Sequence, residues 1–189
     1  KKGADVNKAN HNGSTPLHVA IRYNHMEVAR VLLEQKADAN RLSPTGRPPL
    51  HMAVASGEVV MAQLLLEHGA RVNETAPRAD GQFPDENYTA LFALLHFGPT
   101  GDDGIVTMVG QRGDDGALAI AQLLIAAGAD TMHTTSTRAR YNVLYLASMS
   151  VFRYWQRTAD WLTSTRGLNR AEIIKSLVAS PTAIPVTFS

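Results

Sequence analysis

Thr15-Pro16-Leu17-His18-Val19-Ala20 decides the fold of this chain, because the segment returns 33 residues later as Pro48-Pro49-Leu50-His51-Met52-Ala53. A second segment has the same period. Residues 3–7 (GADVN) return as residues 36–40 (KADAN) and again as residues 69–73 (GARVN). A fixed period of this size predicts stacked supersecondary units and not one globular core. Such a stack presents a long surface to its partners.

Each unit has the pattern of two short helices. Thr15 can cap the first helix, and Pro16 suits its first position, where no N–H is needed. Leu17, Ala20 and Ile21 then fall on one helical face. Helices of roughly 8–11 residues are too short to be stable alone in water, so we expect each apolar face to be buried against a neighbouring unit. The second helix of the first unit has apolar residues at spacings of three and four, namely Met26, Val28, Val31, Leu32 and Leu33.

Particular residues mark the ends and the caps of these helices. Asn24 interrupts the first helix, and Gly69 closes a second helix with a backbone that tolerates positive φ. His18 and His51 take the third helical position, within reach of a cap hydroxyl and of the neighbouring hairpin. Pro48 stands where the first unit has its capping threonine, so the second unit lacks a cap that is worth about 1 kcal/mol.

This combination of motifs resembles the ankyrin repeat family. The family pattern runs Asp-x-x-Gly-x-Thr-Pro-Leu-His-x-Ala, then Gly-His and a Leu-Leu helix, then Gly-Ala-Asp-Val-Asn. Residues 8–40 match it almost throughout, and residues 41–73 match it well. The resemblance implies an all-α solenoid of stacked helix-turn-helix units with hairpin fingers. It also implies a structural role for His18 and His51.

The period divides the chain into one continuous domain of about four units. The third unit is longer than the period requires, because Lys36 and Gly128 are 92 residues apart where two periods give 66. We expect the 26 extra residues to form insertions in the finger and between the two helices. We also expect the chain to be part of a longer protein. The predicted segments are 1–7 as the remnant of an upstream repeat, 8–40 as repeat 1, 41–73 as repeat 2, 74–130 as repeat 3 with insertions, and 131–189 as a divergent repeat 4 with a C-terminal cap.

Composition restricts the classes of site that the chain can hold. It has no cysteine, which excludes disulfides and thiolate metal sites. No apolar run approaches the roughly 18 residues of a membrane span. The net charge of +1 predicts no general affinity for nucleic acid. We expect a monomeric domain in an intracellular setting, cytoplasmic or nuclear. Charge is uneven, because residues 74–116 have a net charge of −6 and residues 134–175 one of +5.

No group of side chains in the sequence predicts catalysis. The seven histidines lack the spacing of metal ligands, and the two Gly-Asp-Asp-Gly stretches at 101–104 and 113–116 lack the alternating oxygen ligands of a calcium loop. Phosphate-binding loops and nucleophile elbows are also missing. We therefore predict no enzyme, with no catalytic residues, no metal site and no cofactor.

The resemblance implies a protein partner that binds the concave face of the stack. In this family that face consists of hairpin fingertips and the exposed side of each first helix. The chain is therefore predicted to be a protein–protein interaction module. Arginine and aromatic side chains at such positions are common interface anchors. Transferred position by position, the candidate partner-binding residues are Ser14, Arg22, Tyr23, Arg47, Ser56, Tyr88, His96 and Phe97.

Residues 151–170 support an alternative function, because arginines alternate with aromatic residues in this insertion. Such a segment can stack on bases and bind phosphates, so nucleic acid or another acidic ligand is possible there. It can equally contact a protein or cap the last repeat. A further alternative is a regulatory domain of a larger enzyme in the same polypeptide. The residues of the basic patch are Arg153, Trp155, Arg157, Trp161 and Arg166.

Overall fold

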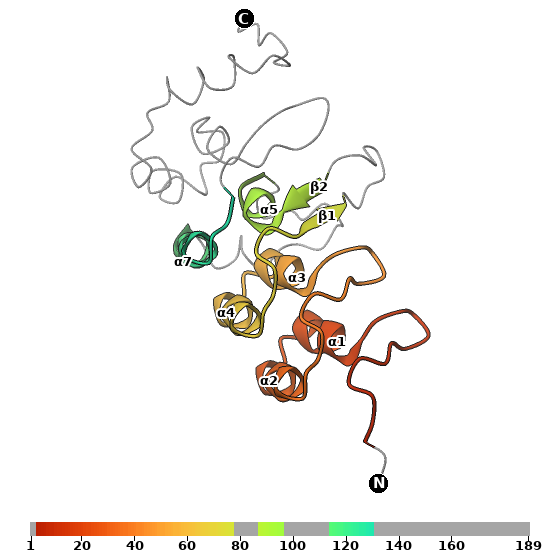
Figure 1. Cartoon of the computed structure of the whole chain (residues 1–189). Helices are drawn as coiled ribbons and strands as arrows, with labels where there is room; N and C mark the ends of the chain where they lie inside the picture. Colours follow the sequence, from red (N-terminus) through yellow and green to blue (C-terminus); the bar gives the residue numbers. More distant parts are fainter. Residues whose placement is uncertain (1–2, 78–86, 97–113, 131–189) are drawn as a thin grey trace, which may run out of the picture.

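The computed structural model describes residues 3–77, 87–96 and 114–130, in which the helices form two layers (Figure 1). One layer lies beside the loops that project as fingers, and the other lies on the opposite side of the stack. The predicted repeat 4 and cap, residues 131–189, lie outside the described residues. The finger-side layer is α1 (Pro16–Arg22), α3 (Pro49–Ala55) and α5 (Ala90–His96), and the outer layer is α2 (Met26–Glu34), α4 (Val59–Glu67) and α7 (Asp114–Ala126).

The helices begin and end close to the residues that the sequence predicted as caps and breaks. Thr15 caps α1, where its Oγ1 accepts the backbone N–H of His18 at 3.4 Å. Asn24 interrupts the chain after α1 with a φ of +53°, and Gly69 ends the turn after α4 with a φ of +84°. Pro48 precedes α3, which has no side-chain cap, as the sequence indicated.

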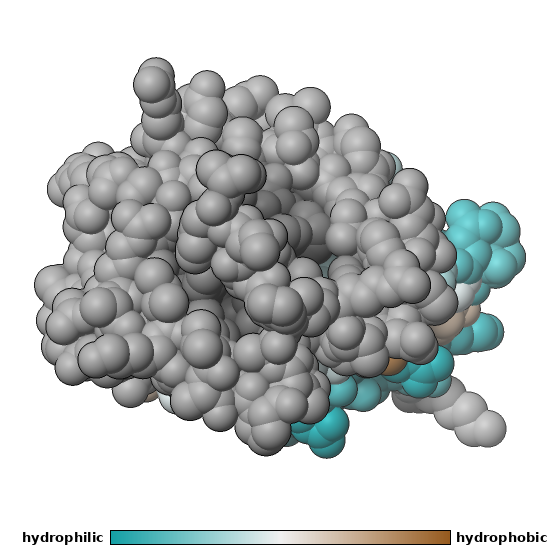
Figure 2. Space-filling model, turned by 90° about the horizontal axis from the view of Figure 1, so that it is seen from above, coloured by the Kyte–Doolittle hydropathy of each residue, from teal (hydrophilic) through white to brown (hydrophobic). Residues whose placement is uncertain are grey.

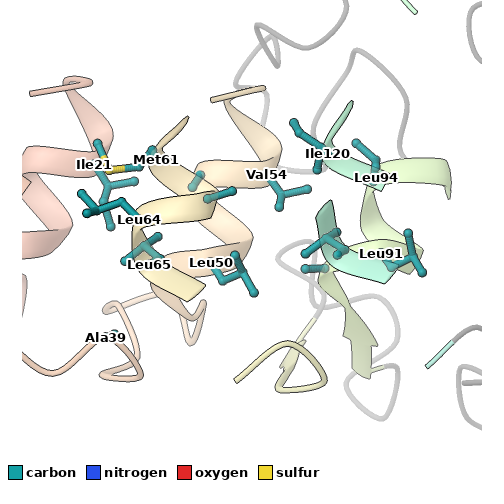
Figure 3. Close-up of a cluster of buried hydrophobic side chains, with 14 of the residues drawn as sticks. Ile21, Ala39, Leu50, Val54, Met61, Leu64, Leu65, Leu91, Leu94 and Ile120 are labelled. Atoms are coloured by element: carbon teal, nitrogen blue, oxygen red, sulfur yellow. The ribbon is translucent and has the colours of Figure 1, made fainter. Parts of the chain in front are cut away.

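Buried leucine, isoleucine and methionine side chains hold the helix pairs together. Within a pair, α1 packs on α2 and α3 packs on α4, and α1, α3 and α5 also pack along their own layer. In Figure 3, Ile21 of α1 lies beside Met61 of α4, so one core continues from one unit to the next. Leu65 and Leu91 belong to the same cluster. This continuity is what short helices require, since none of them is stable alone.

The predicted apolar face of α2 is only partly buried. Leu33 is buried, but Val28 and Val31 are 51% and 55% exposed. Their counterparts one period later, Met61 and Leu64, are 0% and 3% exposed. The expectation that Val28 and Val31 are buried is therefore wrong. The apolar period is the same in both helices, but α4 lies between α2 and α7, whereas the described contacts of α2 are on one side.

Three asparagines, each at the end of a unit, join successive turns. In each case the side-chain NH₂ of the asparagine donates to a backbone carbonyl at the end of the next unit. The side-chain oxygen of the same asparagine accepts the backbone N–H of the residue two positions after that carbonyl. The six distances range from 2.7 to 3.4 Å. The pairs are Asn7 with Lys36 and Asp38, Asn40 with Gly69 and Arg71, and Asn73 with Gly128 and Asp130.

The asparagine ladder also spans the longer third unit. Asn40 and its carbonyl partner are 29 residues apart, whereas Asn73 and its partner are 55 apart. The difference is 26, the surplus that the period predicted. The chain thus accommodates the extra residues without losing the link between neighbouring turns.

The third finger begins as a short antiparallel hairpin. Its strands are β1 (Thr75–Pro77) and β2 (Asn87–Thr89), with Thr75 opposite Thr89 and Ala76 opposite Tyr88. Residues 78–86, in the predicted finger insertion, lie outside the described residues. Within the part of the chain that the structure describes, no helix has the length and apolar character needed to cross a membrane.

Candidate functional site

The first two fingers have the same turn structure. In finger 1 (residues 8–14) the N–H of Asn10 donates to the carbonyl of Ser14 at 2.9 Å, and in finger 2 (residues 41–47) the N–H of Ser43 donates to Arg47 at 2.9 Å. A Cβ added to Gly13, where φ is +78°, would meet the ring of Pro44 at 3.4 Å, so the fingers lie against each other. These hydrogen bonds within the chain fix the shape of both fingertips in the absence of a partner.

His18 fixes finger 2 to α1. Its Nε2 donates to the carbonyl of Arg41 at 2.8 Å, and its Nδ1 lies 3.0 Å from the backbone nitrogen of Thr15, whose N–H it accepts. The predicted contacts with the cap hydroxyl and the neighbouring finger are thereby confirmed. Burial lowers the pKa of His18, and the charges of Arg41 and Arg22 lower it further, whereas the bond to the Arg41 carbonyl raises it.

His51 repeats this link in the second unit but lacks half of its partners. Its Nε2 donates to the carbonyl of Glu74 at 2.9 Å. Its Nδ1 is buried and has no hydrogen-bond partner among the described residues, because Pro48 offers neither an N–H nor a hydroxyl. Burial lowers the pKa of His51 to about 4; the Glu74 carbonyl opposes this shift and the charge of Arg47 adds to it. The ring is therefore neutral near pH 7.

We expect Pro48→Thr to raise the free energy of unfolding by about 1 kcal/mol. The new hydroxyl and N–H restore the missing cap and give His51 Nδ1 a donor, which outweighs the extra freedom of the unfolded chain. Urea denaturation at pH 7 measures the change. Pro48→Val, which regains the N–H but not the hydroxyl, is the matched control. A Thr variant no more stable than the Val variant would contradict this account of the cap.

Arg22 and Tyr23, two of the predicted binding residues, are exposed at the end of α1. Val19 lies three and four residues before them, so all three share one face of the helix. Tyr23 is 65% exposed, and its ring stacks on His25 at a centroid distance of 6.2 Å. An aromatic side chain this exposed is not used by the core of the repeat.

Three other predicted residues are less exposed than Tyr23. Ser14 and Arg47 are half-buried at equivalent positions of the two fingers, and Ser56 is half-buried at the C-terminal end of α3. We call the surface formed by the two fingers and the exposed sides of α1 and α3 the finger-side surface. It consists of the same elements, hairpin fingertips and the exposed side of each first helix, from which the sequence prediction built a concave face.

The structure removes Tyr88 from the candidate binding residues. Its side chain is only 4% exposed, and its ring lies 5.7 Å from that of His51. The expectation of an exposed anchor at Tyr88 is therefore wrong, because the ring fills the space between the second and third units. His96 is the last residue of α5, and its side chain is not described. The remaining predicted residues, Phe97, Arg153, Trp155, Arg157, Trp161 and Arg166, lie outside the described residues.

Sequence reasoning missed two exposed residues of the finger-side surface, Arg41 and Leu42. They begin finger 2, directly after the segment that His18 holds. Leu42 is 48% exposed. An apolar residue at the start of a predicted hairpin, next to an arginine, was the available signal. Among the described residues, no three His, Asp or Glu side chains gather as metal ligands would.

Comparison with known proteins gives one family match. Residues 2–76 match the family model of ankyrin repeats, in three copies. No curated protein matches the sequence. The match covers the first two units with their fingers, and the links made by Asn7 and Asn40. It confirms the predicted all-α solenoid of stacked helix pairs.

Proposed function

We propose that this chain, whose residues 2–76 are ankyrin repeats, binds a partner protein through the finger-side surface and has no catalytic role of its own. Ankyrin repeats are generally protein–protein interaction modules and typically non-catalytic. The proposal adds to this general role a particular surface and particular residues. Arg22 and Tyr23 are its central contacts, and Ser14, Arg47 and Ser56 are further, less exposed residues of the same surface.

The observation that best supports this surface is the exposure of Arg22 and Tyr23 on a rigid element. The buried face of α1 is formed by Leu17, Ala20 and Ile21, so neither residue is needed for packing. Tyrosine and arginine are the residue types that most often dominate binding energy at interfaces. The described residues that are visible in Figure 2 are mainly hydrophilic with small hydrophobic areas between them, a mixture that suits a non-obligate interface.

Preformed fingers also support the proposal. The turns close through backbone hydrogen bonds at 2.8–2.9 Å, and His18 ties finger 2 to α1 at 2.8 Å. A surface held in this way loses little conformational freedom when a partner binds, so more of the contact energy appears as affinity.

We expect the double substitution Arg22→Ala and Tyr23→Ala to weaken partner binding by more than about 1 kcal/mol. Affinity capture with mass spectrometry identifies the partner, and calorimetric titration measures its affinity. The melting temperature should not change, because both side chains are exposed. The matched control is Val28→Ala with Val31→Ala, which removes comparably exposed side chains from α2. A loss of affinity in the control pair alone would contradict the proposal.

The alternative binding role of residues 151–170 stays a prediction, since those residues lie outside the described part of the chain. It has a separate test. Binding of single-stranded nucleic acid through Arg153, Arg157 and Arg166 would weaken steeply with salt, because released counterions dominate such complexes. Regulation of an enzyme in the same polypeptide likewise stays a prediction.

A further inference from the structure

Charge is separated between the two sides of the first two units. Residues 8–23 and 41–56, which form the finger side, contain four basic residues and no Asp or Glu. Residues 24–38 and 57–71, which form the outer side, contain three basic and five acidic residues. Although the whole chain has a net charge of only +1, the finger side of its first two units carries positive charge alone. The four basic residues are Lys8, Arg22, Arg41 and Arg47.

Arg22 and Arg41 come from different units but lie on the same part of this surface. The carbonyl of Arg41 is 2.8 Å from His18 Nε2, and Arg22 follows His18 by one helical turn. Consistent with this placement, both charges act to lower the pKa of His18. Both side chains are exposed, and within the described residues neither forms an ion pair. Two guanidinium groups are thus available to the solvent.

Apolar side chains accompany these arginines. Val19 and Tyr23 share the exposed face of α1 with Arg22, and Leu42 follows Arg41 directly. Guanidinium groups bind carboxylates in bidentate geometry, and an exposed aromatic or aliphatic group accepts an apolar side chain of the partner. Both kinds of contact occur within one small region at the junction of α1 and finger 2.

We propose that the finger-side surface binds an acidic segment of a separate protein, one that combines Asp or Glu residues with at least one apolar side chain. The inference rests on the proposed function and specifies the chemistry of its partner. Nucleic acid fits less well. The sequence pI of about 8.3 is below the range above about 9 that is typical of nucleic-acid-binding domains.

The test selects random peptides of about twelve residues, by display, on the whole chain immobilised at low salt. We expect the enriched peptides to carry more Asp and Glu than Lys and Arg, together with an apolar residue. The most enriched peptide is then synthesised with a fluorescent label, and its affinity for the chain is measured by anisotropy. Rising salt should weaken its binding, because charges at the surface are screened.

Charge reversal locates the contact. Arg22→Glu with Arg41→Glu should weaken binding of the selected peptide about tenfold or more. The matched control, Arg30→Glu with Lys36→Glu, lies on the outer side and brings the chain to the same net charge, from +1 to −3. It should leave the affinity within about twofold. Equal losses in both double variants would overturn the inference, since they would mean unlocalised attraction.

Other outcomes separate this inference from the proposed function. Enrichment of neutral or basic peptides that lose affinity with Arg22→Ala and Tyr23→Ala would overturn the acidic partner and leave the proposed surface standing. Acidic peptides that bind regardless of Arg22, Tyr23 and Arg41 would overturn both. A single-stranded oligonucleotide that competes for Arg22 and Arg41 with equal affinity would overturn the acidic protein segment in favour of nucleic acid.

Discussion

Leu65→Ala is expected to lower the free energy of unfolding by about 2–5 kcal/mol. Leu65 is fully buried in α4, which packs against α2, α3 and α7. In a stack each unit is stabilised mainly by its neighbours, so a cavity in α4 weakens the contacts on both sides. Urea denaturation followed by circular dichroism at fixed pH measures the loss.

Val31→Ala is the internal comparison for this prediction. Val31 belongs to the same kind of helix one unit earlier, but it is more than half exposed. Its truncation should change the free energy of unfolding by no more than about 0.5 kcal/mol. A loss near zero at Leu65, or equal losses at the two positions, would mean that the helices do not stack in the register described.

Stability is expected to fall by about 3 kcal/mol as the pH is lowered from 7 to 4, through His51 alone. Its pKa is lowered from 6.5 to about 4 in the folded protein. Between these values the unfolded chain binds a proton that the folded chain excludes, so acid favours unfolding. The stabilisation is complete above pH 6.5, declines as the pH falls, and levels off near pH 4. His18, whose pKa is also lowered, acts in the same direction.

His51→Gln isolates this effect, because glutamine does not titrate and its NH₂ group can still donate a hydrogen bond. The variant has its own stability at pH 7, so the informative quantity is the slope of unfolding free energy against pH. We expect this slope to be clearly shallower between pH 6.5 and 4 in the variant than in the unchanged chain. The contribution of His18 to the slope is the same in the two proteins. Parallel profiles would show that His51 is not the buried neutral group described.

Local chemistry that recurs every 33 residues made most of the fold predictable. Thr15 caps α1, His18 reaches the next finger, and Gly69 ends the turn after α4, because each of these roles depends on residues close in sequence or one period away. The 26 extra residues of the third unit could also be counted from the period. The structure shows that Asn73 still bonds the end of this longer unit.

Contacts between units were less predictable. Val28 and Met61 have the same place in the apolar period, yet among the described helices α4 has outer-layer neighbours in α2 and α7, whereas α2 has one in α4. Tyr88 stands at the position of an exposed finger residue, but its ring packs against His51. Periodicity identifies which residues are apolar and where helices lie. It does not say which of those faces a neighbour covers.

The candidate site was likewise predictable in part. Exposure of Arg22 and Tyr23 followed from their places at the end of a helix whose other face is core. The contribution of Arg41 did not, because the sequence predicted that His18 reaches the neighbouring finger but not which residue of that finger it meets. The loss of a cap at Pro48 was predicted, but the unpartnered nitrogen of His51 required the packed structure.

Hydroxyl-radical footprinting of the chain, with and without its captured partner, tests the finger-side surface most directly. The comparison uses exposed side chains on both sides of the stack, Tyr23 and Leu42 on the finger side and Val31 and Val60 on the outer side. Binding through the finger-side surface predicts that the partner protects Tyr23 and Leu42 and leaves the two valines as reactive as before. Protection of Val31 and Val60, with Tyr23 and Leu42 unchanged, would contradict it.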